Sequence, residues 1–295
     1  MSTEPWTVGR LLKWTTDYFK QRSFENPRLD AEVLLAHVRG CERIRLYTAF
    51  EEVADDEQRE AFRELVRRRA AGTPVAYLVG HREFFSLSFD VTPDVLIPRP
   101  ETEHLVTELL DRAKELAPLF EPPLSIADVG TGSGAIAVAT AKQLPTCQVT
   151  SVDLSEAALA VARGNAEKHE VADRVRFVHG DLLAKLPAEP TFHIVASNPP
   201  YVSEREFAEL DVQVREHEPR MALVAGPQGT EIIARLINEA AERLHVGGWL
   251  LMELSPMIEA ASRELILAHG DFHEPRVTKD LAGLARVIQA QRRAR

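Results

Sequence analysis

SIADVGTGSGAIAVA, residues 125–139, decides the fold of this chain. It joins a short apolar segment to a run of small apolar residues through a turn with three glycines. Glycine allows a tight turn and lets a ligand lie against bare backbone, and the free N–H groups at the start of a helix attract a negative group. The order of strand, glycine turn and helix predicts a nucleoside-binding unit of an α/β fold. Its expected ligand contacts are Asp128, Gly130, Thr131, Gly132, Ser133 and Gly134.

Short apolar segments alternate with helical segments through the rest of the chain. Strands are expected at residues 125–130, 148–153, 175–181, 192–198, 248–255, 272–278 and 285–292, and helices at residues 135–144, 156–169 and 231–244. Alternation of this kind indicates a parallel sheet with helices on both faces. The predicted fold class is therefore α/β, with a doubly wound, mostly parallel sheet.

The first part of the chain has a different pattern. Residues 7–22, 29–40, 55–72 and 101–116 have the apolar spacing of helices. Between the last two, apolar and polar residues alternate over residues 83–98 with an interruption at TPD, which predicts a two-stranded ribbon. We expect a helical bundle at residues 1–82, a β-hairpin linker at 83–100 and the α/β domain at 101–295.

Composition narrows the possible functions. Lys and Arg total 35 against 45 Asp and Glu, and the net charge of -10 has the wrong sign for a protein that binds nucleic acid through its phosphates. We see neither a signal peptide nor a membrane span, so a cytoplasmic protein is expected. Cys41 and Cys147 lack a CxxC spacing, and we assign no metal site. Nothing in the sequence indicates more than a monomer.

Acidic residues end two further strands of the predicted sheet. Asp153, followed by Leu154, ends the second strand, where a carboxylate accepts hydrogen bonds from ribose hydroxyls. Asp181 ends the third strand, where it can accept a hydrogen bond from an adenine amino group, and Leu182 can cover the ring. The carboxyl ends of parallel strands meet at one edge of a sheet, so we expect these residues in one crevice. Nicotinamide dinucleotides and S-adenosylmethionine both bind in such a crevice.

The glycine spacing helps to separate these two cofactors. The third glycine of GxGxG comes one residue earlier than in the dinucleotide pattern. Asp128, two residues before the first glycine, could pair directly or through water with the ammonium of a methionine moiety, which nicotinamide dinucleotides lack. The alternative is that Asp128 caps the glycine turn. The spacing favours S-adenosylmethionine.

NPPY, residues 198–201, follows the fourth predicted strand. Two prolines fix two φ angles and remove two donors, so the turn is stiff. A planar nitrogen conjugated to a carbonyl or ring is a poor nucleophile, because its lone pair is delocalised, and it must be held in line with a methyl donor. The Asn198 side-chain oxygen and the Pro199 carbonyl can hold such an NH2 group, with Tyr201 against its flat face. We predict that Asn198, Pro199, Pro200 and Tyr201 are catalytic and bind substrate, and that Asn198 also contacts the cofactor.

Together, the glycine turn, the acid after the second strand and NPPY resemble class I S-adenosylmethionine-dependent methyltransferases that modify planar amino nitrogens. Within that class the chain resembles the release-factor glutamine methyltransferases, the HemK or PrmC family. The matching segments are residues 77–103, 128–139, 198–202, 218–229 and 279–287. The resemblance implies a seven-stranded Rossmann-like methyltransferase sheet and a helical bundle that helps engage the release factor.

The resemblance also implies an activity. A methyl group would pass from S-adenosylmethionine to the side-chain amide nitrogen of the glutamine in the GGQ motif of peptide chain release factors. Within IPRPETE, residues 97–103, Arg99 and Glu101 would lie near the cofactor and bind substrate. Gly130 to Gly134 and Asp153 would hold the cofactor, and Leu182 would flank its adenine.

Three positions depart from the family pattern. Leu182 stands where an aromatic residue is common, Gln228 stands where the family has an aspartate, and ELSPMI at residues 253–258 replaces a Glu-x-Gly pattern. The departures lie outside the glycine turn and NPPY, so they bear on affinity more than on reaction type. Three alternatives stay open: an amino-methyltransferase acting on adenine or cytosine of nucleic acid, a cofactor-binding protein without catalysis, and a nicotinamide oxidoreductase.

Overall fold

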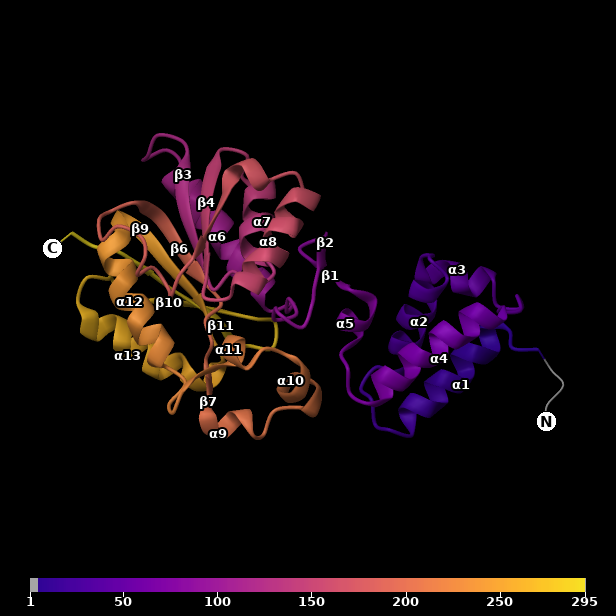
Figure 1. Cartoon of the computed structure of the whole chain (residues 1–295). Helices are drawn as coiled ribbons and strands as arrows, with labels where there is room; N and C mark the ends of the chain where they lie inside the picture. Colours follow the sequence, from indigo (N-terminus) through magenta and orange to yellow (C-terminus); the bar gives the residue numbers. More distant parts are fainter. Residues whose placement is uncertain (1–4, 295) are drawn as a thin grey trace. The chain divides into compact units, whose positions relative to one another are not determined.

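A computed structural model describes residues 5–294 of the chain (Figure 1). Its residues form two compact units. Unit 1 contains the residues up to His81 together with Val212–His217, and unit 2 contains Arg82–Asp211 and the residues from Glu218 onward. Unit 1 is therefore built from two separate stretches of sequence.

Unit 1 is a helical bundle. Its helices are α1 (Val8–Lys20), α2 (Pro27–Val38), α3 (Arg43–Thr48), α4 (Asp56–Ala70), α5 (Val75–Val79) and α10 (Val212–His217). The side chains of Thr7 and Asp55 cap α1 and α4 by accepting hydrogen bonds from backbone N–H groups of the first turn. The apolar faces of the helices meet in a core that includes Leu12, Phe19 and Leu34, all fully buried.

A buried ion pair joins two helices of unit 1. Arg69 of α4 donates to the carboxylate of Asp30 of α2 at 2.8 Å, and another nitrogen of its guanidinium donates to the side-chain oxygen of Gln213 in α10. Burial raises the pKa of Asp30, and the positive charge of Arg69 opposes that shift. Removing Arg69 would leave a buried carboxylate without its partner, which is strongly destabilising.

Unit 2 begins with a two-stranded ribbon, β1 (His81–Phe84) and β2 (Leu87–Asp90), whose first residue belongs by its contacts to unit 1. Phe85 and Ser86 form its turn with φ angles of 50° and 60°. The chain then reaches α6 (Thr102–Leu116) through an irregular segment that contains the first five residues of IPRPETE. A two-stranded ribbon is thus present, but it differs from the one expected over residues 83–98: its turn is at Phe85 and Ser86, and it ends at Asp90, before the TPD interruption.

The main sheet has seven strands in the order β10-β11-β9-β6-β3-β4-β5. They are β3 (Leu124–Val129), β4 (Cys147–Asp153), β5 (Val175–His179), β6 (Phe192–Ser197), β9 (Leu244–Glu253), β10 (Arg276–Lys279) and β11 (Ala285–Gln291). Six of them, including β10, run in the same direction, and β11 is antiparallel to its neighbours β9 and β10. Strand order reverses between β3 and β6, and the loops that follow these two strands open a crevice at the sheet edge.

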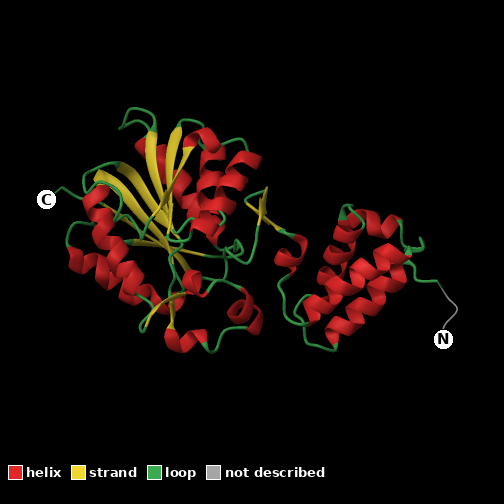
Figure 2. Ribbon diagram, viewed as in Figure 1, coloured by secondary structure: helices red, strands yellow, loops and turns green. Residues whose placement is uncertain are grey.

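Helices cover both faces of this sheet (Figures 1 and 2). On one face lie α6, α7 (Ala135–Gln143) and α8 (Glu156–Lys168), and on the other α12 (Glu231–Arg243) and α13 (Glu259–His269). The central strands are mostly apolar because both of their faces are buried. In β6 all six residues are buried, and four of them, Phe192, Ile194, Val195 and Ala196, are apolar. The predicted doubly wound α/β fold is confirmed.

Short elements lie between β6 and α12. They are the ribbon of β7 (Val202–Ser203) and β8 (Val224–Gly226), and the helices α9 (Glu204–Phe207) and α11 (Arg220–Leu223), with α10 assigned to unit 1. In α9, Ser203 and Glu206 form a reciprocal capping box. Among residues 5–294, no helix has the length and apolar character needed to cross a membrane.

Candidate active site

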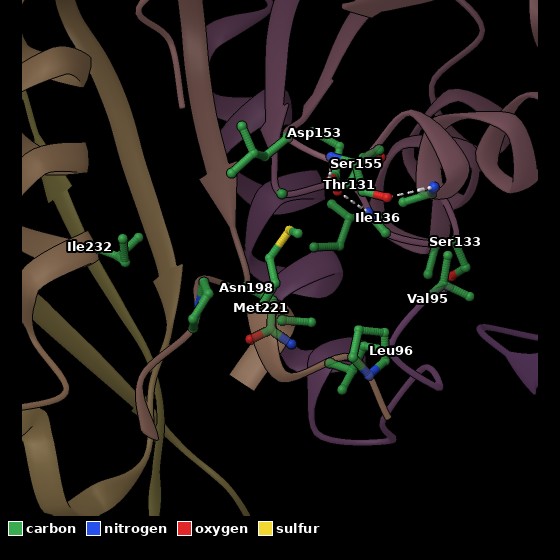
Figure 3. A pocket seen from close by; sticks show the side chains of 18 of the residues that line it. Val95, Leu96, Thr131, Ser133, Ile136, Asp153, Ser155, Asn198, Met221 and Ile232 are labelled. Atoms are coloured by element: carbon green, nitrogen blue, oxygen red, sulfur yellow. Dashed lines mark hydrogen bonds between the residues drawn. The ribbon is translucent and has the colours of Figure 1, made fainter. Parts of the chain in front are cut away.

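A cavity of about 380 Å³ lies at the carboxyl ends of β3, β4, β5 and β6 in unit 2. This volume falls within the range of roughly 300–1,000 Å³ that is typical of small-molecule sites. Figure 3 shows that residues of the glycine turn, the end of β4 and the turn after β6 surround the same cavity. The crevice predicted from the strand ends is therefore present as a cavity.

The glycine turn is shaped by backbone hydrogen bonds to β4. The N–H groups of Gly130 and Thr131 donate to the carbonyl of Val152, and Gly132 N–H donates to the Asp153 carboxylate at 2.9 Å. Gly134 has a φ of 81°, and a Cβ there would lie 3.1 Å from the Cβ of Ala162 in α8. Glycine at position 134 thus lets α7 begin in close contact with α8.

Asp153 holds the loops on both sides of it. One carboxylate oxygen accepts the Gly132 N–H and the other accepts the N–H of Ser155 at 2.8 Å. Both Asp153 and Ser155 line the cavity, where Figure 3 places them near Thr131. The carboxylate is half-buried and still borders the space that a ribose would occupy.

Asp128 lies beneath the glycine turn and does not line the cavity. Its side chain is fully buried and accepts a hydrogen bond from the Thr131 hydroxyl at 2.6 Å, while its second oxygen has no partner. Burial raises the pKa of Asp128 to about 7, and the Thr131 hydroxyl opposes that rise. The contact with a cofactor ammonium stays a prediction, whereas the alternative reading, a cap of the turn, matches the Thr131 contact.

Asp181 and Leu182 follow β5 and line the opposite part of the cavity. Arg235 of α12 donates to the Asp181 carboxylate at 2.8 Å. Leu182 has a φ of 48°, a left-handed conformation that is costly for a branched side chain and turns the chain sharply after Asp181. A ligand that hydrogen-bonds to Asp181 would share this carboxylate with Arg235.

Residues 94–99, the cover segment, border the cavity on another side. Arg99 donates to Glu218 at 2.6 Å, and the Ile97 N–H donates to the same carboxylate at 3.3 Å. The Glu218 side chain is only 2% exposed, so this contact is protected from solvent screening. Figure 3 shows Val95 and Leu96 of the cover segment beside the cavity. The contact joins IPRPETE to EPRMALVAGPQG across 119 residues of sequence.

Asn198 lies directly after β6, at the start of the Pro-Pro turn. Its side-chain NH2 donates to the hydroxyl of Thr102 at 3.2 Å, and both residues line the cavity. The preceding residue, Ser197, is anchored to β3 by a 2.7 Å hydrogen bond from its hydroxyl to the Val129 carbonyl. Asn198 is thus held at the edge of the sheet, beside the glycine turn of the neighbouring strand.

Two further ionisable groups lie close to this turn. Glu253 ends β9 and is 2% exposed, and burial raises its pKa to about 7. Burial also raises the pKa of Tyr201, and the negative charge of Glu253 adds to that rise. Tyr201 packs against the apolar cluster beneath α12 and α13 and is absent from the cavity lining. Its predicted contact with the substrate face stays a prediction.

The predicted residues divide into two groups. Those that line the cavity are Arg99, Gly130, Thr131, Gly132, Ser133, Asp153, Leu154, Asp181, Leu182, Asn198 and Pro200. Those that do not are Glu101, Asp128, Gly134, Pro199 and Tyr201. Sequence reasoning missed lining residues that carry no charge or glycine signal, among them Val95, Thr102, Ile136, Met221 and Ile232.

Gly229 supports the Asn-Pro-Pro-Tyr turn from outside the cavity. Its φ is 82°, and a Cβ there would lie 2.6 Å from the backbone oxygen of Tyr201. Gly247 has a similar φ of 85° with nothing within 4 Å of its Cβ position. It therefore serves as a control for the backbone strain alone.

We expect Gly229→Ala to lower the free energy of unfolding more than Gly247→Ala does. Left-handed strain accounts for about 1–2 kcal/mol in each variant, and the clash with Tyr201 adds about 1–3 kcal/mol in Gly229→Ala alone. Urea denaturation followed by circular dichroism measures both values. Equal losses in the two variants would show that the contact with Tyr201 does not constrain position 229.

Comparisons with known families cover most of the chain. The family model of the PrmC N-terminal domain matches residues 10–80, and that of the methyltransferase small domain matches residues 107–215. A release factor glutamine methyltransferase of Rhodopirellula baltica is 55% identical over 288 residues, covering 98% of this chain and 97% of that protein. Another from Nitratidesulfovibrio vulgaris is 40% identical over 292 residues, covering 99% of this chain and 97% of that protein.

Solved structures share the fold at lower identity. The catalytic domain of hMettl16 in complex with an RNA hairpin has a TM-score of 0.57 at 17% identity, covering 77% of this chain and 82% of that chain. The 16S rRNA N2 G1207 methyltransferase of T. thermophilus, in complex with AdoMet and guanosine, has a TM-score of 0.53 at 19% identity. It covers 72% of this chain and 50% of that chain. These similarities show a methyltransferase fold.

Proposed function

Because the chain belongs to the release factor glutamine methyltransferase family, we propose that it methylates the side-chain amide nitrogen of the glutamine in the GGQ motif of peptide chain release factors. S-Adenosylmethionine is the proposed methyl donor. One observation carries the proposal: a single cavity is bordered both by a glycine turn suited to a nucleoside cofactor and by Asn198 on a stiff Pro-Pro turn.

The residues present fit S-adenosylmethionine. Asp153 already accepts the Gly132 and Ser155 N–H groups, so its carboxylate is fixed at the place where ribose hydroxyls would reach it. Asp181 can accept a hydrogen bond from the adenine amino group, and Leu182 and Ile136 offer apolar contacts to the ring. When bound, this cofactor supplies an electrophilic methyl group on a positively charged sulfur.

The chain's own residues position the substrate nitrogen. The Asn198 side-chain oxygen and the Pro199 carbonyl each accept a hydrogen bond from one N–H group of the glutamine amide. These two contacts align the amide nitrogen with the methyl group. Because both N–H directions are fixed, the amide cannot rotate freely. Its nitrogen is therefore held in a near-attack geometry toward the methyl group. The cover segment, tied by Arg99 to Glu218, limits the access of water to the reacting groups. A strong base is not required, because the amide proton can leave after transfer.

Unit 1 is proposed to engage the release factor. It matches the PrmC N-terminal domain, and it carries large exposed apolar side chains that a protein partner could cover. They include Trp14, Ile44, Tyr47 and Val53, which are 50%, 64%, 51% and 60% exposed.

Mass spectrometry of a purified release factor tests the function. Incubated with this protein and S-adenosylmethionine, the release factor is expected to gain one methyl group on the GGQ glutamine. A release factor in which that glutamine is replaced by glutamate, of equal shape but without the amide nitrogen, should gain none. DNA and RNA are offered in parallel reactions. Methyl transfer to either nucleic acid with none to the release factor would overturn the proposed substrate and favour the nucleic-acid alternative.

A further inference from the structure

Two buried side chains, Thr102 and Glu253, lie beside Asn198. The Asn198 NH2 group donates to the Thr102 hydroxyl at 3.2 Å, and the carboxyl group of Glu253, one of whose buried oxygens has no hydrogen-bond partner, lies beside this hydroxyl. Thr102 is 5% exposed and Glu253 is 2% exposed. The sequence pattern and the proposed mechanism assign no role at the active site to Thr102 or Glu253.

The backbone fixes the positions of all three residues. Met252 of β9 lies opposite Ser197 of β6, so Glu253 and Asn198 follow at the same edge of two hydrogen-bonded strands. On its other side, Glu253 lies opposite Val287 of β11. Thr102 is the first residue of α6, which packs on β6 and β9. The contacts therefore join the ends of regular elements rather than mobile loops.

Hydrogen-bond accounting determines which way the Asn198 amide faces. An ionised carboxylate only accepts, and a threonine hydroxyl has one hydrogen to donate. When Thr102 gives that hydrogen to Glu253, its oxygen can only accept from Asn198, so the NH2 group of Asn198 must face Thr102. The amide oxygen then points away from Thr102 and is available to a substrate nitrogen. Without such a constraint the two orientations of an amide have nearly the same shape.

We propose that Glu253 and Thr102 are positioning residues, which hold the Asn198 amide with its oxygen toward the substrate NH2 group. This inference rests on the proposed function, because it concerns how the same site presents its acceptor. An amide in the reverse orientation would present two N–H donors to the substrate NH2 and would repel it.

The arrangement depends on the charge of Glu253. The charged and titratable groups that face it are Glu101 before α6, Arg99 of the cover segment, Arg286 of β11 and Tyr201 after the Pro-Pro turn. Burial raises the pKa of Glu253 to about 7, Glu101 raises it further, and Arg286 and Arg99 oppose the rise. A protonated Glu253 can donate to Thr102, whose hydrogen then becomes free to turn toward Asn198.

The raised pKa of Glu253 determines how kcat/KM should change with pH. Because the pKa is raised, the carboxylate form that fixes the amide predominates only above about pH 7. The value of kcat/KM should therefore rise as the pH increases through about 7, since this parameter reports the ionisation of the free enzyme.

Three variants of the full chain test the proposal. Thr102→Val keeps the shape of the side chain but removes the hydroxyl, and Thr102→Ser keeps the hydroxyl. Methylation of a release factor at saturating S-adenosylmethionine gives kcat and KM, and calorimetry gives the cofactor Kd. We expect kcat to fall about tenfold in Thr102→Val and to recover to within about twofold in Thr102→Ser. Cofactor Kd should change little in both.

Glu253→Gln provides a readout that a structural role would not change. A glutamine can donate to or accept from Thr102, so the amide orientation is no longer enforced, and kcat/KM should be low with no rise between pH 6 and 8. The outcomes are distinguishable. If the wild-type protein does not methylate the release factor, the proposed function fails. If the wild-type protein does, then full activity of Thr102→Val, equal losses in Thr102→Val and Thr102→Ser, or an unchanged pH profile in Glu253→Gln would overturn the positioning role.

Discussion

Replacing Asn198 by alanine is expected to lower kcat for methyl transfer at least about a hundredfold. The substitution removes the side-chain oxygen that orients the substrate NH2 group and leaves only the Pro199 carbonyl as an acceptor. Ser197 still donates to Val129 and the prolines still fix the turn, so the sheet edge keeps its geometry. The loss should therefore appear in turnover and not in folding.

The measurement is single-turnover methylation of a release factor, followed by mass spectrometry. Asn238→Ala is the matched control, because Asn238 is an exposed asparagine on α12 that does not line the cavity. This control should retain wild-type rates, and both variants should bind S-adenosylmethionine with Kd values within a few-fold of the wild-type value. Full turnover by Asn198→Ala would rule out the orienting role of its amide.

Replacing Asp153 by alanine is expected to raise the Kd for S-adenosylmethionine about 10- to 100-fold. Hydrogen bonds to a charged group contribute about 1.5–3 kcal/mol each, and every 1.4 kcal/mol corresponds to a tenfold change in Kd. The change removes the acceptor for ribose and also frees the N–H groups of Gly132 and Ser155, which loosens the glycine turn.

Isothermal titration calorimetry measures this Kd. Glu156→Ala is the control, since Glu156 is an exposed acid of α8 three residues further along that lies outside the cavity lining. It removes the same charge without removing a ribose acceptor. At saturating cofactor, Asp153→Ala should recover much of its turnover, in contrast to Asn198→Ala. A Kd that rises equally in Asp153→Ala and Glu156→Ala would mean that net charge, not the position of the carboxylate, governs binding.

The regular part of the fold was predictable because its signals are local. Strand β6 is mostly apolar and Asn198 follows it directly, and α8 begins after the capping residue Ser155, so the bounds of both can be read from the sequence within a residue or two. The glycine turn was also predictable from the sequence. Position 134 requires a glycine, because its φ is positive and its backbone packs closely on Ala162.

Other features depended on tertiary contacts that spacing does not encode. Glu218 meets Arg99 across 119 residues, and Thr102 meets Asn198 across 96. The position of Asp128 also depended on the folded structure. An acid beside a glycine turn can face a ligand or lie beneath the turn, and the structure shows that Asp128 is fully buried. The short helices α3, α5, α9 and α11 have too few residues to show a period.

The inclusion of α10 in unit 1 has a consequence for the chain's covalent topology. A single break in the backbone near His81 would leave residues 212–217 in the other fragment, although they complete the bundle and supply Gln213 to Arg69. The severed pieces would then stay associated as complementing fragments, as a nicked protein does. An excised bundle ending at His81 would instead lack one of its own helices, with the Asp30–Arg69 pair missing a neighbour. The smaller unit is thus complete only when the larger unit's chain has been synthesised past residue 217.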